Sequence, residues 1–125
     1  ARAAYEVALE YAKQRDIWGQ PIGKYQAIGN MLVDMEADLE MARLMVYRLA
    51  WQADNESDVE RLPPNMAKCY PAEMARRVTV NAMQILGGYG YMKDYPTEKY
   101  VRDAMVMPII GGANEVLKYF MSLKL

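Results

Sequence analysis

Three glycine-containing turns hold the residues of this sequence that could bind a polar ligand. In the first turn, residues 15–23, the Arg15 guanidinium lies three positions before the Trp18 indole. A guanidinium can bind a phosphate through two parallel hydrogen bonds, and an indole can stack on a flat heterocycle. The pair therefore indicates a site for a phosphorylated aromatic compound. The more ordinary alternative is a surface ion pair for Arg15 and core packing for Trp18.

The second turn is the run Gly87-Gly88-Tyr89-Gly90, which comes shortly after Gln84. Two adjacent glycines allow a ligand or a second backbone to approach closely, although a simple helix C-cap also explains them. The spacing differs from the dinucleotide-binding fingerprint, which follows a strand and opens a helix. The turn is therefore a candidate contact point and not a Rossmann motif.

The third turn is the run Ile110-Gly111-Gly112-Ala113-Asn114-Glu115, which precedes the last predicted helix. The free N–H groups at the start of a helix suit an anion or an electron-rich ring edge. Ordinary N-capping by the Asn114 side chain is the alternative. Just upstream, Arg102 and Asp103 are interpreted as a structural ion pair.

The residue types that are missing exclude most common reaction mechanisms. The chain has no histidine and one cysteine, Cys69, so Ser-His-Asp, Cys-His and thiolate metal sites cannot be built from it. We therefore expect no metal site, and a reducing, intracellular setting. Lys and Arg total 15 against 16 Asp and Glu, a net charge of -1 that argues against a nucleic-acid partner. No apolar run reaches the roughly 20 residues of a membrane span.

Apolar residues repeat at helical spacing in the first half of the chain, which predicts two antiparallel helices joined near Gly19–Pro21. The first would bury Ala4, Tyr5, Ala8, Tyr11 and Ala12. The second would bury Ile28, Leu32, Met35, Leu39, Ala42, Val46 and Leu49. The acidic run 54–58 then predicts a solvated loop.

A third helix is predicted to start at Pro63-Pro64 and to end at the second glycine turn. It would bury Ala67, Tyr70, Met74, Val78, Ala82 and Ile85. Pro71 lies inside this stripe, where it removes a backbone donor, so we expect a bend or a break there.

Two further helices, at about 96–104 and 114–123, complete the prediction, and no segment indicates a strand. The fold class is all-α: an up-and-down four-helix bundle with an additional short helix, in one domain over residues 1–125. The 11 methionines are interpreted mainly as core packing.

In order and spacing, these segments resemble the C-terminal helical domain of the acyl-CoA dehydrogenase family. That domain carries Arg-x-x-Phe-Gly-x-Pro-Ile-Gly, then Gln-Ile-x-Gly-Gly-x-Gly-Tyr, Arg-Asp-Ala and a Glu-Gly-Thr loop. The counterparts here are residues 15–23, 84–91, 102–104 and 111–113. The resemblance implies that the chain, which begins inside a helix at Ala1, is a fragment lacking an N-terminal helical domain and a middle β domain.

The resemblance also implies FAD as the cofactor and assigns roles to individual residues. Arg15 would hold the FAD pyrophosphate of a neighbouring subunit, with Trp18 (in place of the usual Phe) and Gln26 beside it. Gln84, Gly87 and Gly88 would line the adenosine part of that FAD. Ala113, Asn114 and Glu115 would lie near the flavin of their own subunit, with Gly112 on the substrate side.

The family removes the α-proton of an acyl-CoA with a carboxylate while the β-hydrogen leaves as hydride to FAD, which gives a trans-2-enoyl-CoA. Most members carry that Glu in the third turn, where this chain has Gly111. Glu115 is a poor candidate for the base, so the isolated fragment is predicted to be inactive. Either the base lies upstream of Ala1, as in the isovaleryl and long-chain branches, or the chain comes from a non-catalytic subunit of a mixed tetramer.

The implied partners are an acyl-CoA substrate, electron-transfer flavoprotein and further copies of the chain in a homotetramer. The implied location is the bacterial cytoplasm or the mitochondrial matrix. A competing hypothesis makes the chain a purely structural assembly bundle. Its apolar faces would lack their missing neighbours in isolation, so we expect the isolated chain to form oligomers or aggregates.

Overall fold

The computed structural model describes residues 1–55 and 64–123, and within these ranges the chain forms six α-helices. None of these helices is long and apolar enough to span a membrane. A two-stranded hairpin and a 3₁₀ turn, η1 (Ile22–Lys24), separate the first two helices. The helices are α1 (Arg2–Gln14), α2 (Gln26–Asn55), α3 (Pro64–Leu86), α4 (Gly88–Tyr91), α5 (Thr97–Val106) and α6 (Asn114–Ser122).

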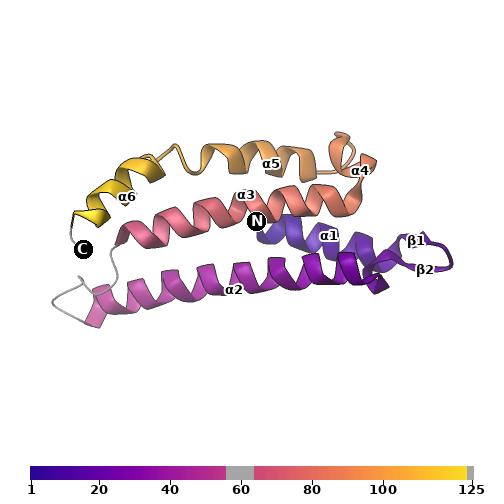
Figure 1. Cartoon of the computed structure of the whole chain (residues 1–125), viewed down its shortest axis with the longest axis horizontal. Helices are drawn as coiled ribbons and strands as arrows, with labels where there is room; N and C mark the ends of the chain where they lie inside the picture. The colour runs from indigo at the N-terminus through magenta and orange to yellow at the C-terminus, as the bar shows by residue number, and fades with distance from the viewer. Residues whose placement is uncertain (56–63, 124–125) are drawn as a thin grey trace.

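The long segments alternate in direction, as Figure 1 shows: α1 runs antiparallel to α2, α3 returns along both, and α5 and α6 run back along α3. The predicted all-α class is confirmed. The fourth position of the bundle, however, is shared by α5 and α6 in succession and is not filled by one helix. The short helix α4, at the corner after α3, was not predicted.

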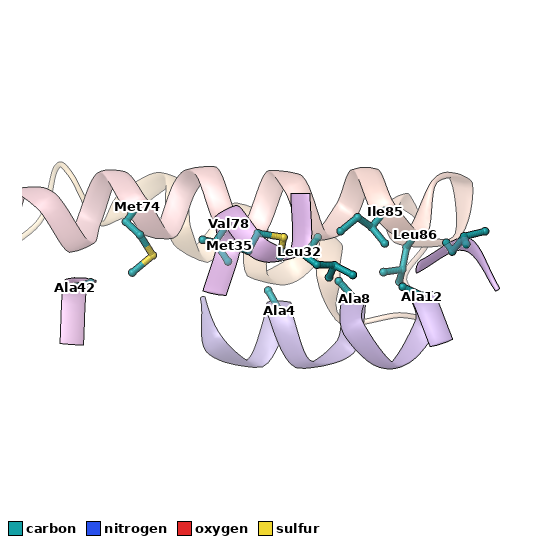
Figure 2. Close-up of a cluster of buried hydrophobic side chains, with 12 residues drawn as sticks. Ala4, Ala8, Ala12, Leu32, Met35, Ala42, Met74, Val78, Ile85 and Leu86 are labelled. Carbon is teal, nitrogen blue, oxygen red and sulfur yellow. The ribbon is translucent and has the colours of Figure 1, made fainter. Parts of the chain in front are cut away.

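Small residues on α1 allow the first three helices to pack closely. Ala4, Ala8 and Ala12 lie one helical turn apart and are at most 1% exposed. They face apolar side chains of α2 and α3 (Figure 2). The buried cluster on those two helices consists of Leu32, Met35, Ala42, Met74, Val78, Ala82, Ile85 and Leu86.

The predicted stripes match this core at most positions, with exceptions near their ends. Val46 of α2 is 43% exposed, so the buried stripe of α2 weakens toward its C-terminal half. Met35 and Met74 are buried as expected, whereas five other methionines are at least 40% exposed, namely Met41, Met66, Met92, Met105 and Met107. Core packing therefore explains only part of the methionine content.

The first turn is a β-hairpin, which contradicts the prediction that the chain has no strand. β1 (Asp16–Ile17) pairs antiparallel with β2 (Gln20–Pro21). Trp18 and Gly19, the two residues between the strands, have φ of 51° and 85°. Two successive positive φ values are the conformation that matches the twist of a tight hairpin. Strands of two residues are too short to show the alternation from which a strand is recognised in sequence.

Helix α2 is longer than predicted, because Asp54 and Asn55 belong to it and not to a loop. The rest of the acidic run, 56–58, lies outside the described residues. Helix α3 starts at Pro64 as predicted and continues through Pro71, so of the expected bend or break the break does not occur. A proline inside a helix loses one hydrogen bond and its ring clashes with the preceding turn, at a cost of about 3 kcal/mol. The packing of α3 against α2, α5 and α6 offsets this cost.

A polar network attaches α6 to α3, and Asn114 is its centre. The Asn114 side chain is fully buried; its Nδ2 donates to Glu73 Oε1 at 2.9 Å, and its Oδ1 accepts from Lys68 Nζ at 2.7 Å. Ala113 occupies the N-cap position, without a side-chain hydrogen bond. The N-cap interpretation of Asn114 is therefore wrong, because its amide joins two helices instead.

The predicted ion pair between Arg102 and Asp103 is also wrong. Adjacent residues on a helix point in different directions, and each of these pairs with the residue four positions before it. Arg102 Nε lies 2.8 Å from Glu98 Oε2, and Asp103 pairs with Lys99. Both pairs lie within α5.

The corner between α3 and α4 requires a glycine at position 90 and not at position 88. A Cβ on Gly90 would lie 2.5 Å from the Met83 carbonyl oxygen, whereas a Cβ on Gly88 would meet nothing within 4 Å. We therefore expect Gly90→Ala to lower the free energy of unfolding by about 1–3 kcal/mol and Gly88→Ala to change it by less than about 0.5 kcal/mol. Urea titrations followed by circular dichroism would measure both; equal stabilities would contradict the packing.

The network around Asn114 makes stability depend on pH through Glu73. The amide hydrogen bond from Asn114, helped by the charges of Arg76 and Lys118, holds the pKa of Glu73 below its ordinary value, although burial opposes this. A lowered pKa in the folded state stabilises the fold fully above the ordinary carboxyl range, and the stabilisation is lost as the pH falls through the folded-state pKa.

We therefore expect Glu73→Gln to be less stable than the wild type at pH 6–7, and the gap to shrink as the pH falls below about 4.5. Denaturant titrations at several pH values would show this. A gap that stays constant down to pH 3 would mean that the Glu73 charge does not contribute.

Candidate functional site

The first two glycine turns meet at one end of the molecule, where the structure forms a groove of about 570 Å³. Figure 1 shows the end of α1, the hairpin β1–β2 and the short helix α4 together at this end. Arg15, which follows α1, and Gly87 and Gly88, which follow α3, both line this groove. The lining consists of Tyr11, Arg15, Ile17, Ile22, Ile85, Leu86, Gly87, Gly88, Tyr89 and Met92.

Arg15 is the cation of this groove, and no carboxylate of the described residues pairs with it. The residue is exposed, and its guanidinium carbon lies 6.0 Å from the centre of the Tyr89 ring. Among residues 1–55 and 64–123, the structure shows no ion pair for Arg15, so the alternative of a surface ion pair is wrong. Backbone hydrogen bonds from Arg15 N to Tyr11 O and from Ile22 N to Arg15 O hold its main chain at the groove edge.

Trp18 and Gln26 do not line the groove. Trp18 lies at the hairpin tip with 91% of its surface exposed, so the alternative of core packing is wrong. Its indole contacts the Tyr25 ring edge to face at 6.1 Å, and the Tyr25 hydroxyl donates to the Ile17 carbonyl at 2.6 Å. Gln26 is exposed at the first position of α2. Both side chains are therefore presented outward, beside the groove.

The double glycine leaves the other wall of the groove open. Gly87 has a φ of 60°, and a Cβ on either Gly87 or Gly88 would meet nothing within 4 Å. A ligand can therefore approach the backbone at these two residues closely. Gln84 lies one turn earlier on α3, is exposed, and is not part of the lining, although its carbonyl accepts a hydrogen bond from Gly87 N.

The third turn lies far from this groove, at the junction of α5 and α6 (Figure 1). Gly111 and Gly112 have φ of 66° and 94°, the left-handed region that favours glycine. Ala113 is half-buried, and Glu115 is exposed in the first turn of α6. The structure thus separates the predicted site residues into two groups, one at each end of α3.

Three site residues were missed in the sequence. Lys68 Nζ donates to the Gly112 carbonyl at 2.6 Å, and Glu73 accepts from Asn114. Tyr89, although part of the second glycine turn, was not assigned a role and lines the groove beside Arg15. One signal was present for Lys68: it lies between Ala67 and Cys69 at the edge of a predicted buried stripe, where a charged side chain needs partners.

Comparison with known proteins agrees with this arrangement of turns. Residues 1–122 match the family model described as the C-terminal domain of acyl-CoA dehydrogenase. The chain is 38% identical over 122 residues to the caffeyl-CoA reductase-Etf complex subunit CarC of Acetobacterium woodii, an alignment that covers 98% of this chain and 32% of the relative.

Solved structures show the same fold. Butyryl-CoA dehydrogenase from Megasphaera elsdenii superposes with a TM-score of 0.87 at 39% identity, covering 94% of this chain and 30% of the other. The FAD complex of PigA superposes with a TM-score of 0.91 at 31% identity, covering 98% and 32%. The chain spans about a third of the length of these proteins, and by its match to the family model it belongs to the acyl-CoA dehydrogenase family, as the C-terminal domain.

Proposed function

We propose that this chain is the FAD-binding and oligomerisation domain of an acyl-CoA dehydrogenase, which oxidises an acyl-CoA to a trans-2-enoyl-CoA. The observation that carries the proposal is the groove that Arg15 lines together with the open backbone at Gly87 and Gly88. A dinucleotide pyrophosphate needs a cation and a backbone that it can approach closely. These three residues supply both.

The residues of the groove fit the charged middle of FAD. The Arg15 guanidinium has no carboxylate partner in the described parts of the chain, so its donors are available to phosphate oxygens. The rest of the lining is mainly apolar, with the exposed Ile17, Tyr89 and Met92 available to a heterocycle. Trp18 and Gln26, which point outward beside the groove, would contact the same FAD from the hairpin side.

The distance between the two groups of site residues supports contact with two different FAD molecules. Lys68 and Leu86 lie 18 positions apart on α3, a distance of about 27 Å at 1.5 Å per residue. In the proposed assembly, Arg15, Gln84, Gly87 and Gly88 hold the FAD of a neighbouring subunit. Ala113, Asn114 and Glu115 lie near the flavin of their own subunit, with Gly112 beside the substrate.

The proton-abstracting carboxylate is proposed to lie upstream of Ala1. FAD, when bound, supplies the hydride acceptor, but Gly111 cannot accept a proton. Glu115, the only carboxylate in the turn 110–115, is exposed on the first turn of α6. The isolated chain is therefore expected to be inactive. An acidic residue in the helical segment before Ala1 of the parent protein would support this proposal, and its absence would favour a non-catalytic subunit of a mixed tetramer.

The proposed partners of the parent protein are an acyl-CoA and electron-transfer flavoprotein. The name of the relative CarC places that protein in a reductase complex with Etf. A bacterial cytoplasmic location, or the mitochondrial matrix, fits such a soluble electron-transfer pair.

A second apolar stripe on α2 supports self-association into a homotetramer. Positions 33, 37, 40, 44, 47 and 51 alternate steps of four and three residues, the spacing of a helix–helix seam. Position 40 is a glutamate, paired with Arg43, and the other five are apolar. The four large apolar side chains of this stripe are each more than half exposed, namely Val33, Leu44, Tyr47 and Trp51. We propose that a second copy of the chain covers this stripe.

Replacing Arg15 tests the FAD proposal in the full-length parent protein. We expect Arg15→Ala to weaken FAD binding roughly 10- to 100-fold, because charge-assisted hydrogen bonds contribute about 1.5–3 kcal/mol. Arg15→Lys should recover part of the loss, since it keeps the charge without the planar fork. Flavin absorbance after gel filtration and a fluorescence titration with FAD would measure this.

Lys13→Ala is the matched control, because Lys13 lies two positions before Arg15, pairs with the exposed Glu10 and is not part of the groove lining. It should leave FAD affinity unchanged. An Arg15→Ala protein that remains as yellow as the wild type would refute the assignment, and a colourless wild type would refute FAD as the cofactor.

Placing a charge in the second stripe of α2 tests the proposed assembly. Leu44→Glu should raise the dissociation constant for self-association at least about tenfold, because an unpaired carboxylate would be buried between helices. Ala53→Glu adds the same charge at an exposed position of α2 outside the stripe and should have little effect. Sedimentation velocity of the isolated chain would distinguish the two. A wild-type chain that is a monomer at all concentrations would contradict the proposal.

A further inference from the structure

Lys68 holds both ends of the turn that joins α5 to α6. Its ammonium group donates to the Gly112 carbonyl at 2.6 Å, to the Pro108 carbonyl at 3.3 Å and to Asn114 Oδ1 at 2.7 Å. An ammonium has three N–H donors, so all three are directed at this one turn. The Pro108 and Gly112 carbonyls lie before and after Gly111 in the chain. Lys68 therefore holds the turn on each side of Gly111.

The side-chain amide of Asn114 links the Lys68 cation to a carboxylate. Its Oδ1 accepts from Lys68, while its Nδ2 donates to Glu73 Oε1 at 2.9 Å and, more weakly, to the Cys69 carbonyl at 3.4 Å. Only a group with an acceptor at one end and a donor at the other can bridge an ammonium and a carboxylate in this way. Through the Asn114 amide, the Glu73 carboxylate balances the partly buried positive charge of Lys68 without a direct ion pair.

The turn needs such tethers because its own residues do little to restrain it. Gly111 and Gly112 both have positive φ, and glycine backbones lose the most conformational freedom on ordering. The side chains of Ile109 and Ile110 are 67% and 51% exposed, so they do not anchor the turn in this chain. The restraint comes from α3, through Lys68, and from the backbone bond of Asn114 N to Pro108 O at 2.9 Å.

We propose that Lys68 is a positioning residue for the reaction, which sets the place of the turn 110–114 relative to flavin and acyl thioester. This inference rests on the proposed function, in which the turn borders the flavin. Lys68 acts through the Gly112 carbonyl and Asn114 and does not touch the reacting atoms. Because a misplacement of about 1 Å can slow a bound reaction roughly 100-fold, loss of the tether should reduce the rate of the chemical step more than substrate affinity.

The experiment uses the full-length parent protein with bound flavin and three variants: Lys68→Met, Lys68→Arg and the control Lys99→Met. Lys99 lies on α5, pairs with Asp103 and does not contact the turn. Hydrogen exchange would report the protection of residues 109–114. Anaerobic stopped-flow mixing with straight-chain and branched acyl-CoAs would give the maximal rate of flavin reduction and the apparent dissociation constant.

We expect Lys68→Met to keep the flavin spectrum, lose protection in residues 109–114, and reduce flavin at least about tenfold more slowly at saturating substrate. The apparent dissociation constant should change less than about threefold. Lys68→Arg should restore part of the rate, because a guanidinium can also donate to several carbonyls. Lys99→Met should behave as the wild type in all measurements.

Unchanged rate and unchanged exchange in Lys68→Met would overturn the proposal, as would a rate loss equal in Lys99→Met. If Lys68→Met does not retain flavin, the Lys68→Arg variant tests the proposal instead. Faster hydrogen exchange in residues 109–114 together with slower flavin reduction would support a positioning role. Wild-type values for both measurements would refute it. If no acyl-CoA reduces the wild-type flavin, the proposed function fails, while hydrogen exchange still shows whether Lys68 holds the turn.

Discussion

The packing of α3 against α1, α2, α5 and α6 is the constraint on which the rest of this structure depends. One face of α3 buries Met74, Val78, Ala82 and Ile85 against the first two helices. Two other residues of the same helix, Lys68 and Glu73, hold α6 in place through hydrogen bonds to Asn114. Because a packed helix is stiff, its two ends hold the groove and the third turn at a fixed separation, and neither region can move independently of the core.

The alanines of α1 determine where Arg15 lies. Ala4, Ala8 and Ala12 give α1 a smooth face, which allows its backbone to approach α3 more closely than larger side chains would. The helix ends at Gln14, so the next residue, Arg15, emerges beside the C-terminal end of α3. Substitution of a larger residue in this face would displace α1 and carry the guanidinium away from the double glycine.

Features that depend on local periodicity or on glycine could be predicted from the sequence, and features that depend on distant partners could not. The helices, the ends of α3 and the meeting of Arg15 with Gly87 follow from apolar spacing and family motifs. The continuity of α3 through Pro71 depends on tertiary contacts that outweigh a local preference. The bridging role of Asn114 depends on Lys68 and Glu73, more than 40 positions away in the chain, so its short-range interpretation as an N-cap was wrong.

The third turn is built so that its shape does not depend on the side chain at position 111. Lys68 binds the carbonyls of Pro108 and Gly112, and the bridging amide belongs to Asn114. A Cβ on Gly111 would meet nothing within 4 Å, although its φ of 66° adds a strain of about 1–2 kcal/mol for a residue with a side chain. The hydrogen bonds that shape the turn therefore do not require a carboxylate, or any other side chain, at position 111. A bundle of this kind can keep its architecture whichever residue stands at position 111.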